Sequence, residues 1–252
     1  MRRFEATDWL TFPILDSRPA RGPSRAAIER LRCHPVVAFC IVLLTGLVLI
    51  ALVSIGLGLF VTRIAEHSWG IGGADERVND WLAAHRTSGR THASVIGSII
   101  AGGVVLPIVV GVGASIAAAA RHWRLAAFSV FSLATESATY RATTLVVHSH
   151  RPRVARLEQL PVNASYPSGH TAAALAVYGG LALLLTSRVR ATALSVLMWT
   201  SVALLVGFVA TSRMYRGMHH PLDVGGGIVV GIAALIVVVL ACRAADTSAS
   251  LR

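Results

Sequence analysis

The stretch PVVAFCIVLLTGLVLIALVSIGLGLFV, residues 35–61, contains no aspartate, glutamate, lysine or arginine. A helix that crosses a bilayer needs about 20 predominantly apolar residues, so this stretch is long enough to span a membrane. It starts too late in the chain for a secretory signal peptide, and it lacks the small-residue cleavage site of one. We therefore expect a permanent membrane anchor.

Comparable apolar stretches continue along the chain. Hydrophobic residues make up 54% of the 252 residues and charged residues only 14%, which is unusual for a water-soluble domain. Four further stretches lack charged residues: 93–120, 171–187, 191–212 and 224–242. A sixth, residues 125–147, carries Glu136 and Arg141, which weaken its hydropathy. We expect an all-α integral membrane bundle of six transmembrane helices over residues 35–252, after a disordered, arginine-rich cytoplasmic tail, residues 1–34.

The distribution of arginine indicates how the bundle is oriented. Seven arginines precede the first apolar stretch, and short cytoplasmic segments are enriched in basic residues. With six spans, both termini are then cytoplasmic, and residues 62–92, 148–169 and 213–223 lie outside. The last two of these segments carry arginines that this rule does not explain, so we expect them to serve another purpose.

The remaining composition excludes several classes of function. The net charge of +11 comes largely from arginines at the ends of spans, without the aromatic and basic interleaving of a nucleic-acid binder. Cys33, Cys40 and Cys242 show no paired spacing, so neither a disulfide nor a zinc site is indicated, and we expect packing roles. All 23 basic residues other than histidine are arginine, which suggests a GC-rich bacterial gene.

The first outer segment contains ADERVNDWLAAHRTSGR, residues 74–90. Val78, Trp81, Leu82 and His85 recur at helical spacing, with charged residues between them, which suits a short helix lying at the membrane interface. A plain solvated connection is the alternative.

Three polar clusters adjoin span ends on the outer side. They are HSHRPR at residues 148–153, PSGH at residues 167–170 and SRMYRGMHHPLD at residues 212–223. A lone Pro-Ser-Gly-His turn would be an ordinary loop before a helix. Ionisable groups near membrane depth are costly, however, so three such clusters on one side indicate a functional site.

These clusters resemble the type 2 phosphatidic acid phosphatase family, which includes lipid phosphate phosphatases, bacterial acid phosphatases and vanadium haloperoxidases. The second family motif is complete at residues 167–170, and the third is complete at Ser212, Arg213, His219 and Asp223. The resemblance covers residues from about 74 to 242 and implies a six-helix bundle with the site among its last four helices.

The first motif departs from the family pattern. Arg151 and Pro152 are present, but Thr144 stands where the family has lysine. Residues three, four and seven apart share a helix face, so Arg141, one turn from Thr144, could supply the missing cation. Alternatively, Arg141 pairs with Glu136 inside the bundle.

The resemblance implies a role for each motif residue. His219 would attack phosphorus, while Asp223 would hold its other ring nitrogen and fix the tautomer. His170 would protonate the departing oxygen and later take a proton from water. Arg151 and Arg213 would clamp the phosphate oxygens, because guanidinium groups form forked hydrogen bonds.

The turn at residues 167–170, which precedes the expected span over residues 171–187, would receive the phosphate. Gly169 permits close backbone approach, and Ser168 offers a hydroxyl and an N–H at a helix start. We expect a secondary or surface role for the other charged residues nearby: His148, His150, Arg153, Arg156, Arg216 and His220. Glu158 stands alone in a loop, and no acidic cluster suggests a metal site.

The implied activity is metal-independent hydrolysis, without a cofactor, of a lipid phosphate through a phosphohistidine. Our first candidate substrate is a polyprenyl pyrophosphate, and the alternatives are phosphatidic acid or another glycerolipid phosphate. Transfer of the phosphate to a lipid acceptor is a second possibility. A noncatalytic lipid-binding protein is a third possibility. It is disfavoured because such a protein would have no reason to keep His170, His219 and Asp223 together. The partners expected are the lipid substrate and membrane lipid, not nucleic acid.

Overall fold

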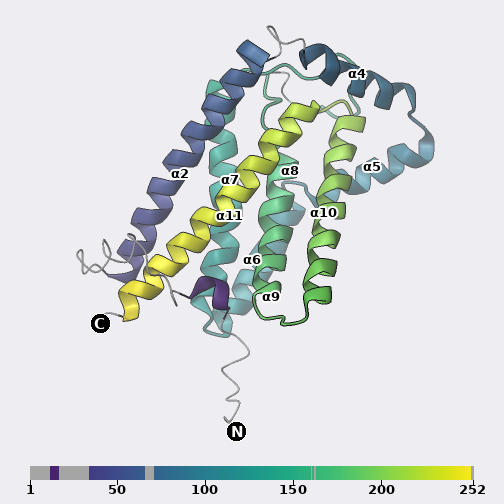
Figure 1. Ribbon diagram of the computed structural model, residues 1–252. Coiled ribbons are helices and arrows are strands. Elements are labelled where there is room, and N and C mark those ends of the chain that lie inside the picture. Colours follow the sequence, from purple (N-terminus) through teal and green to yellow (C-terminus); the bar gives the residue numbers. More distant parts are fainter. Residues whose placement is uncertain (1–11, 17–33, 66–70, 160, 162, 251–252) are drawn as a thin grey trace.

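The computed structural model describes residues 12–16, 34–65, 71–159, 161 and 163–250 (Figure 1). Regular structure in these residues is helical, apart from one isolated bridge between Ser149 and Ala164. The elements are η2 Pro13–Leu15, α2 Pro35–Phe60, η3 Val61–Ala65, α4 Ile71–Ala84, α5 Ser88–Ile100, α6 Val105–Ala119, α7 Trp123–Val146, α8 Gly169–Ala174, η4 Leu175–Gly179, α9 Gly180–Thr186, α10 Thr192–Tyr215 and α11 Pro221–Ser250. The expected all-α class is confirmed.

The bundle is organised around α11, which packs against α2, α7 and α8. Figure 1 shows α11 running across the middle of the bundle, with α2 on one side and α8 and α10 on the other. Small residues permit this close packing. A Cβ at Gly46 would collide with Val237 where α2 meets α11, and one at Gly231 would lie 2.8 Å from the Ala172 carbonyl of α8. The last helix therefore holds the others in place.

Five helical segments are long and apolar enough to cross a membrane, judged by length and composition: Pro35–Ala65, Ser88–Ala119, Gly169–Thr186, Thr192–Tyr215 and Pro221–Ser250. The sixth expected span corresponds to α7, whose hydropathy is lowered by polar side chains. Glu136 lies within α7 and is only 2% exposed, because it faces other helices rather than lipid. The structure thus matches the expected membrane bundle, with α7 as its least apolar member.

The expected span over residues 93–120 is not one continuous helix. It is interrupted at residues 101–104, between α5 and α6. Pro107 has no N–H, and its ring clashes with the carbonyl four residues earlier, so a helix cannot pass undisturbed through Gly102 and Gly103. The two halves pack differently, α5 against α10 and α6 against α7.

The short helix expected within residues 74–90 is present as α4, so the alternative of a plain connection is wrong, while its location at the membrane interface stays a prediction. Figure 1 shows α4 lying across one end of the bundle. The short link to α5 is anchored by Arg86. Its Nε and Nη2 donate to the Tyr215 carbonyl at 3.0 and 2.8 Å, and its Nη1 donates to the Ala155 carbonyl at 2.7 Å.

Part of the tail that we expected to be disordered is ordered. Leu15 is buried against Phe128 and Val238 at the end of the bundle opposite α4. The Arg243 Nε donates to the Ile14 carbonyl at 2.8 Å. The prediction was therefore wrong for residues 12–16, because the side chains of Phe12, Ile14 and Leu15 pack against the bundle. Residues 1–11 and 17–33 lie outside the described residues.

The cysteines are not paired with one another in the described residues. Cys242 is buried in the apolar core, as expected of a packing residue, whereas Cys40 is exposed on α2. Cys33 lies outside the described residues.

Candidate active site

The three motif segments meet at one end of the bundle, beside α4. They lie after α7, before α8 and between α10 and α11. The Ser168 N–H donates to the Asp223 carbonyl at 2.8 Å, which ties the start of α8 to the start of α11. His170 lies within electrostatic reach of His219, Arg151 and Arg213. The structure thus brings together the residues predicted from the second and third motifs and Arg151 from the first.

The ring of His219 is buried and oriented by a backbone carbonyl. Its Nδ1 lies 2.8 Å from the carbonyl oxygen of Ser165. A carbonyl can only accept, so a neutral ring carries its proton on Nδ1 and leaves the lone pair on Nε2. Burial lowers the pKa of His219, outweighing the nearby Asp223 carboxylate, which favours this neutral form. The arrangement is that of a nitrogen nucleophile.

Asp223 acts on this ring less directly than predicted. Its Oδ2 lies 3.8 Å from the His219 Nδ1, too far for a hydrogen bond. The same oxygen accepts from the Ser165 hydroxyl at 2.5 Å and from the His220 N–H at 2.8 Å. Asp223 therefore fixes Ser165, whose carbonyl in turn fixes the tautomer of His219.

His220 lies between two carboxylates. Its Nδ1 is 3.5 Å from Asp223 and its Nε2 is 3.4 Å from Glu76 on α4. Burial alone would lower the pKa of His220, but these two carboxylates raise it to about 9. His220 is thus a cation at neutral pH that ties α4 to the loop between α10 and α11.

The turn that precedes α8 is held by close packing. Tyr166 is joined to Pro167 by a cis peptide bond, and its ring fills a space that a side chain at Gly226 would occupy. The Ser168 hydroxyl lies 2.9 Å from the hydroxyl of Thr171. The turn is therefore fixed on α11 before any ligand binds.

Arg151 holds the loops around the site together. Its Nε donates to the Pro161 carbonyl at 2.8 Å, its Nη2 to the Ala164 carbonyl at 3.0 Å, and its Nη1 to the Met218 carbonyl. A guanidinium has five N–H groups. These three bonds therefore leave two N–H groups for a ligand.

Arg213 presents an unoccupied hydrogen-bonding edge. Its side chain is 0% exposed, and its Nη1 donates to the Ser98 hydroxyl at 2.7 Å and to the Glu158 carboxylate at 2.8 Å. Its Nε and Nη2 have no partner in the described residues. These two nitrogens form the side-on fork that binds two oxygens of a phosphate. Buried donors without partners are costly, and an anion with two oxygens would satisfy both.

Glu158 is a residue of the site that the sequence did not reveal. Its two carboxylate oxygens bind Arg213 at 2.8 Å and Arg216 at 2.5 Å. Burial would raise the pKa of Glu158, but the two arginines lower it to about 2. The prediction of an isolated loop residue was wrong. A glutamate whose partners lie more than 50 positions further along the chain gives no local sequence signal.

Comparison with known proteins identifies the family. A sequence model described as the PAP2 superfamily matches residues 125–245, which include all three motif segments. Residues 125–245 of the chain belong to the PAP2 superfamily. The predicted membership of the type 2 phosphatidic acid phosphatase family is thus confirmed.

A solved structure has the same fold as this PAP2 protein. It is described as the first transmembrane PAP2 type phosphatidylglycerolphosphate phosphatase from Bacillus subtilis. The two chains are 21% identical, with a TM-score of 0.63, and the match covers 76% of the present chain and 93% of the other. No curated protein matches the sequence.

The first motif of this PAP2 protein lacks its lysine, and Tyr140 stands near the vacated position. Its ring carbons lie 3.2 Å from where a Cβ at Gly169 would be, and its hydroxyl is within electrostatic reach of Arg151 and Arg213. Tyr140 was not predicted. It lies four residues before Thr144 and so shares its helix face, which is the signal that could have revealed it.

Arg141 lies on α7, three residues before Thr144. It is exposed, and its side chain makes no ion pair or hydrogen bond within the described part of the chain. The alternative, a pair between Arg141 and Glu136, does not form, since that carboxylate accepts from the Ser137 hydroxyl at 3.1 Å instead. A role for Arg141 as the substitute cation stays a proposal.

In the PAP2 protein, no group of three or more histidine, cysteine, aspartate or glutamate side chains among the described residues could hold a metal ion. The positive charge around the buried His219 comes from Arg151 and Arg213. Two fixed guanidinium groups are the kind of charge that stabilises a transferring phosphoryl group.

Proposed function

We propose that the protein is a membrane phosphatase that hydrolyses the phosphomonoester or pyrophosphate of a lipid through a phosphohistidine. The observation that carries this proposal is the fork of Arg213, buried and unoccupied, in the same site as the neutral ring of His219. An anion held by the fork would face a nitrogen whose lone pair is free.

In the first half of the proposed reaction, the Nε2 of His219 attacks phosphorus. The bond between phosphorus and the departing oxygen breaks, and His170 gives that oxygen a proton. Asp223 keeps the ring in position through Ser165. Arg213 and Arg151 stabilise the charge that develops on the phosphoryl oxygens.

In the second half, water attacks the phosphohistidine. His170 takes a proton from the water, the bond between phosphorus and the Nε2 of His219 breaks, and inorganic phosphate leaves. Ser168 and Gly169 line the approach to the phosphoryl group. The chemistry needs no metal, and the proposal includes none.

Polyprenyl pyrophosphate is the first candidate substrate. A glycerolipid phosphate is the second, supported by the fold shared with a phosphatidylglycerolphosphate phosphatase. An outer location of the site, with both termini cytoplasmic, is supported by the seven arginines that precede the first span, because short cytoplasmic segments are enriched in basic residues. Phosphate binding would then explain the arginines of the motif segments, which this rule does not.

Phosphate release from a panel of lipid phosphates and pyrophosphates tests the proposal. Purified protein in detergent, with a chelator present, should release phosphate from at least one lipid. His219→Ala should abolish this release, while His148→Ala, a matched loss of an exposed histidine from the neighbouring loop, should retain it. Vanadate, which mimics five-coordinate phosphorus, should inhibit.

Three results would contradict the proposal. Labelled phosphate that appears on a lipid acceptor, instead of in solution, would identify a transferase. Lipid binding without turnover and without competition by vanadate would identify a noncatalytic binding protein. Activity that survives His219→Ala would exclude the phosphohistidine.

A further inference from the structure

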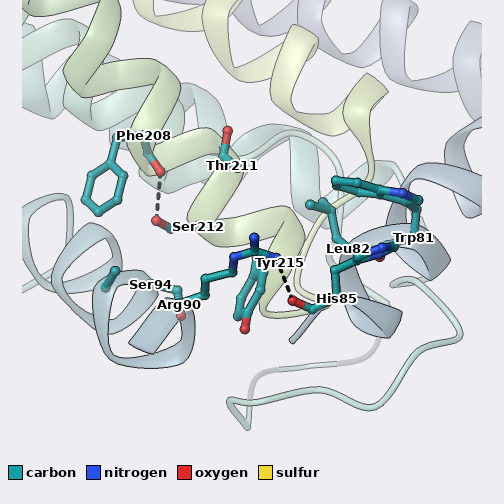
Figure 2. Close-up of a pocket in the computed structure, with 10 residues that line it drawn as sticks. Trp81, Leu82, His85, Arg90, Ser94, Phe208, Thr211, Ser212 and Tyr215 are labelled. Carbon is teal, nitrogen blue, oxygen red and sulfur yellow. Dashed lines mark hydrogen bonds between the residues drawn. The ribbon is translucent and has the colours of Figure 1, made fainter. Parts of the chain in front are cut away.

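A cavity of about 270 Å³ lies beside the site, between α4, α5 and α10 (Figure 2). Its surface is mainly apolar. The lining residues come from the end of α4, the first turns of α5 and the last turns of α10, and they include Trp81, Arg90, Ala93, Ser94, Phe208 and Thr211. None of these residues has a role in the proposed reaction.

The inner wall of this cavity touches the arginine cluster. Ser94 accepts a hydrogen bond from the Arg216 Nη1 at 3.1 Å, and Ser212 directly precedes Arg213 in α10. The phosphate fork and the cavity therefore lie on neighbouring faces of the same helical turn. A ligand bound at the fork has the cavity beside it.

The cavity extends from the site toward the middle of the bundle. Its lining on α10 runs from Phe208 to Tyr215, which is about 10 Å at the rise of an α-helix. The site occupies the end of α10, so the cavity continues from phosphate level toward the centre of the apolar span. This is the direction in which a hydrocarbon chain runs from the phosphate of a membrane lipid.

The outer side of the cavity is exposed. Trp81 is 59% exposed and Phe208 is 40% exposed. At the other edge, the Arg90 Nη1 donates to the His85 carbonyl at 3.0 Å, a bond drawn in Figure 2. Tryptophan and arginine together are typical of the boundary between lipid and water. A lipid could therefore reach the cavity sideways from the membrane.

We propose that this cavity binds the part of the lipid's hydrocarbon chain nearest the phosphate. The proposal rests on the proposed lipid phosphatase activity and adds that the enzyme recognises the chain as well as the phosphate. A substrate with a chain long enough to fill the cavity is then aligned for attack, whereas a short-chain phosphate is held by its phosphate alone.

A second apolar cavity lies deeper in the bundle, between α6, α7 and the segment from η4 to α9, and none of its lining residues belongs to α10, the helix that carries Arg213. On α7 its lining residue nearest the site, Ser132, is about 21 Å from Val146, but Ala176 on η4 is only about 9 Å along the helix from His170. This distant cavity is therefore the competing location for the chain, which the test below distinguishes.

The physical contribution of the cavity is alignment. A hydrocarbon chain leaves surroundings in the bilayer that are as apolar as the cavity, so its transfer gains little hydrophobic free energy. Fixing the chain instead reduces the orientations available to the phosphate. Misplacement of about 1 Å can cost roughly a hundredfold in rate, so blocking the cavity should affect kcat/KM strongly.

Two substitutions that fill the cavity from different helices test the proposal. Ala93→Phe acts from α5 and Thr211→Phe from α10. Val95→Phe is the matched control, because Val95 lies on α5 but outside the cavity, and Gly113→Leu fills the distant cavity instead. Phosphate release is measured with two substrates that share one headgroup and differ only in chain length.

Wild-type protein should prefer the long-chain substrate. Each filling variant should lower kcat/KM for that substrate about tenfold, within the range set by misalignment, and should leave kcat/KM for the short-chain substrate within about twofold. Both controls should keep the wild-type preference. Phe208→Ala, which enlarges the cavity, should shift the preference toward bulkier chains.

An unchanged chain-length preference in both filling variants would overturn the proposal. So would an equal loss with both substrates, since the cavity would then support the site instead of holding the chain. A loss of preference in Gly113→Leu alone would assign the chain to the distant cavity. If wild-type protein releases no phosphate from any lipid, the proposed function itself has failed, so the two failures are distinguishable.

Discussion

Glu158→Gln isolates the contribution of the carboxylate that holds one edge of Arg213. Glutamine has nearly the same shape but no charge, and it can accept from only one of the two arginines. Nη1 of the buried Arg213 then keeps the Ser98 hydroxyl but loses its ion pair with Glu158. The fork is left free to rotate away from the phosphate.

The pKa of Glu158 gives the magnitude. A fall from 4.5 to about 2 corresponds to roughly 3 kcal/mol of interaction with the two arginines. The side chain is 25% exposed, so solvent screening reduces this to about 1–2 kcal/mol. If Arg213 needs that interaction in the transition state, kcat/KM should fall about tenfold.

The assay is phosphate release at neutral pH, with kcat and KM determined separately. Asp16→Asn is the matched control, because it removes a carboxylate paired with Arg124 at 3.2 Å near the opposite end of the bundle. It should leave both constants unchanged. In Glu158→Gln, the loss should appear mainly in kcat, since an aligned fork acts most strongly on the transition state.

The opposite result would refute this reasoning. If Glu158→Gln lowers KM or raises kcat/KM, the carboxylate competes with phosphate for Arg213 instead of orienting it. A lower unfolding temperature with unchanged kcat/KM would show that Glu158 only stabilises the fold.

Three further predictions concern packing, pH and charge. Gly226→Ala should destabilise the protein by about 1–3 kcal/mol, because the added Cβ would collide with Tyr166. Gly225→Ala should not, because the space at its Cβ is open. Thermal unfolding in detergent measures both variants, and equal unfolding temperatures would contradict the packing argument. Because the pKa of His220 is raised to about 9, the stability that its charge gives the folded protein is complete below about pH 6.5 and is lost as pH rises through 9. His220→Asn should therefore flatten this part of the plot of unfolding temperature against pH. An unchanged slope would exclude His220 as the titrating group. Arg141→Ala tests whether Arg141 replaces the missing lysine: kcat/KM should fall about tenfold or more if Arg141 reaches the phosphate, whereas a change of less than about twofold, as for an exposed side chain outside the site, would exclude that role.

The sequence predicted the fold class and the positions of most spans, because long uncharged stretches have few stable conformations outside a membrane helix. It also predicted residues that the structure brings together, since His219 and Asp223 lie four positions apart and Pro167 to His170 form one turn. These are local patterns, which spacing along the chain can reveal.

Other features depend on contacts between distant segments. The pairing of Glu158 with Arg213 and Arg216 joins two loops, and the carbonyl of Ser165 replaces Asp223 as the direct partner of His219. No periodicity predicts which carbonyl faces a buried ring. The interruption of the second span could have been predicted from its two glycines and Pro107, but its hydropathy concealed it.

That interruption, at residues 101–104, divides one membrane-crossing segment into two helices, α5 and α6, which pack against different neighbours. Ser98, on α5, accepts a hydrogen bond from Arg213, while α6 packs against α7. When a membrane thins or thickens, a continuous helix must tilt as a whole. Here the bend can absorb the change, so the spacing between Ser98 and Arg213 need not follow the thickness of the surrounding lipid.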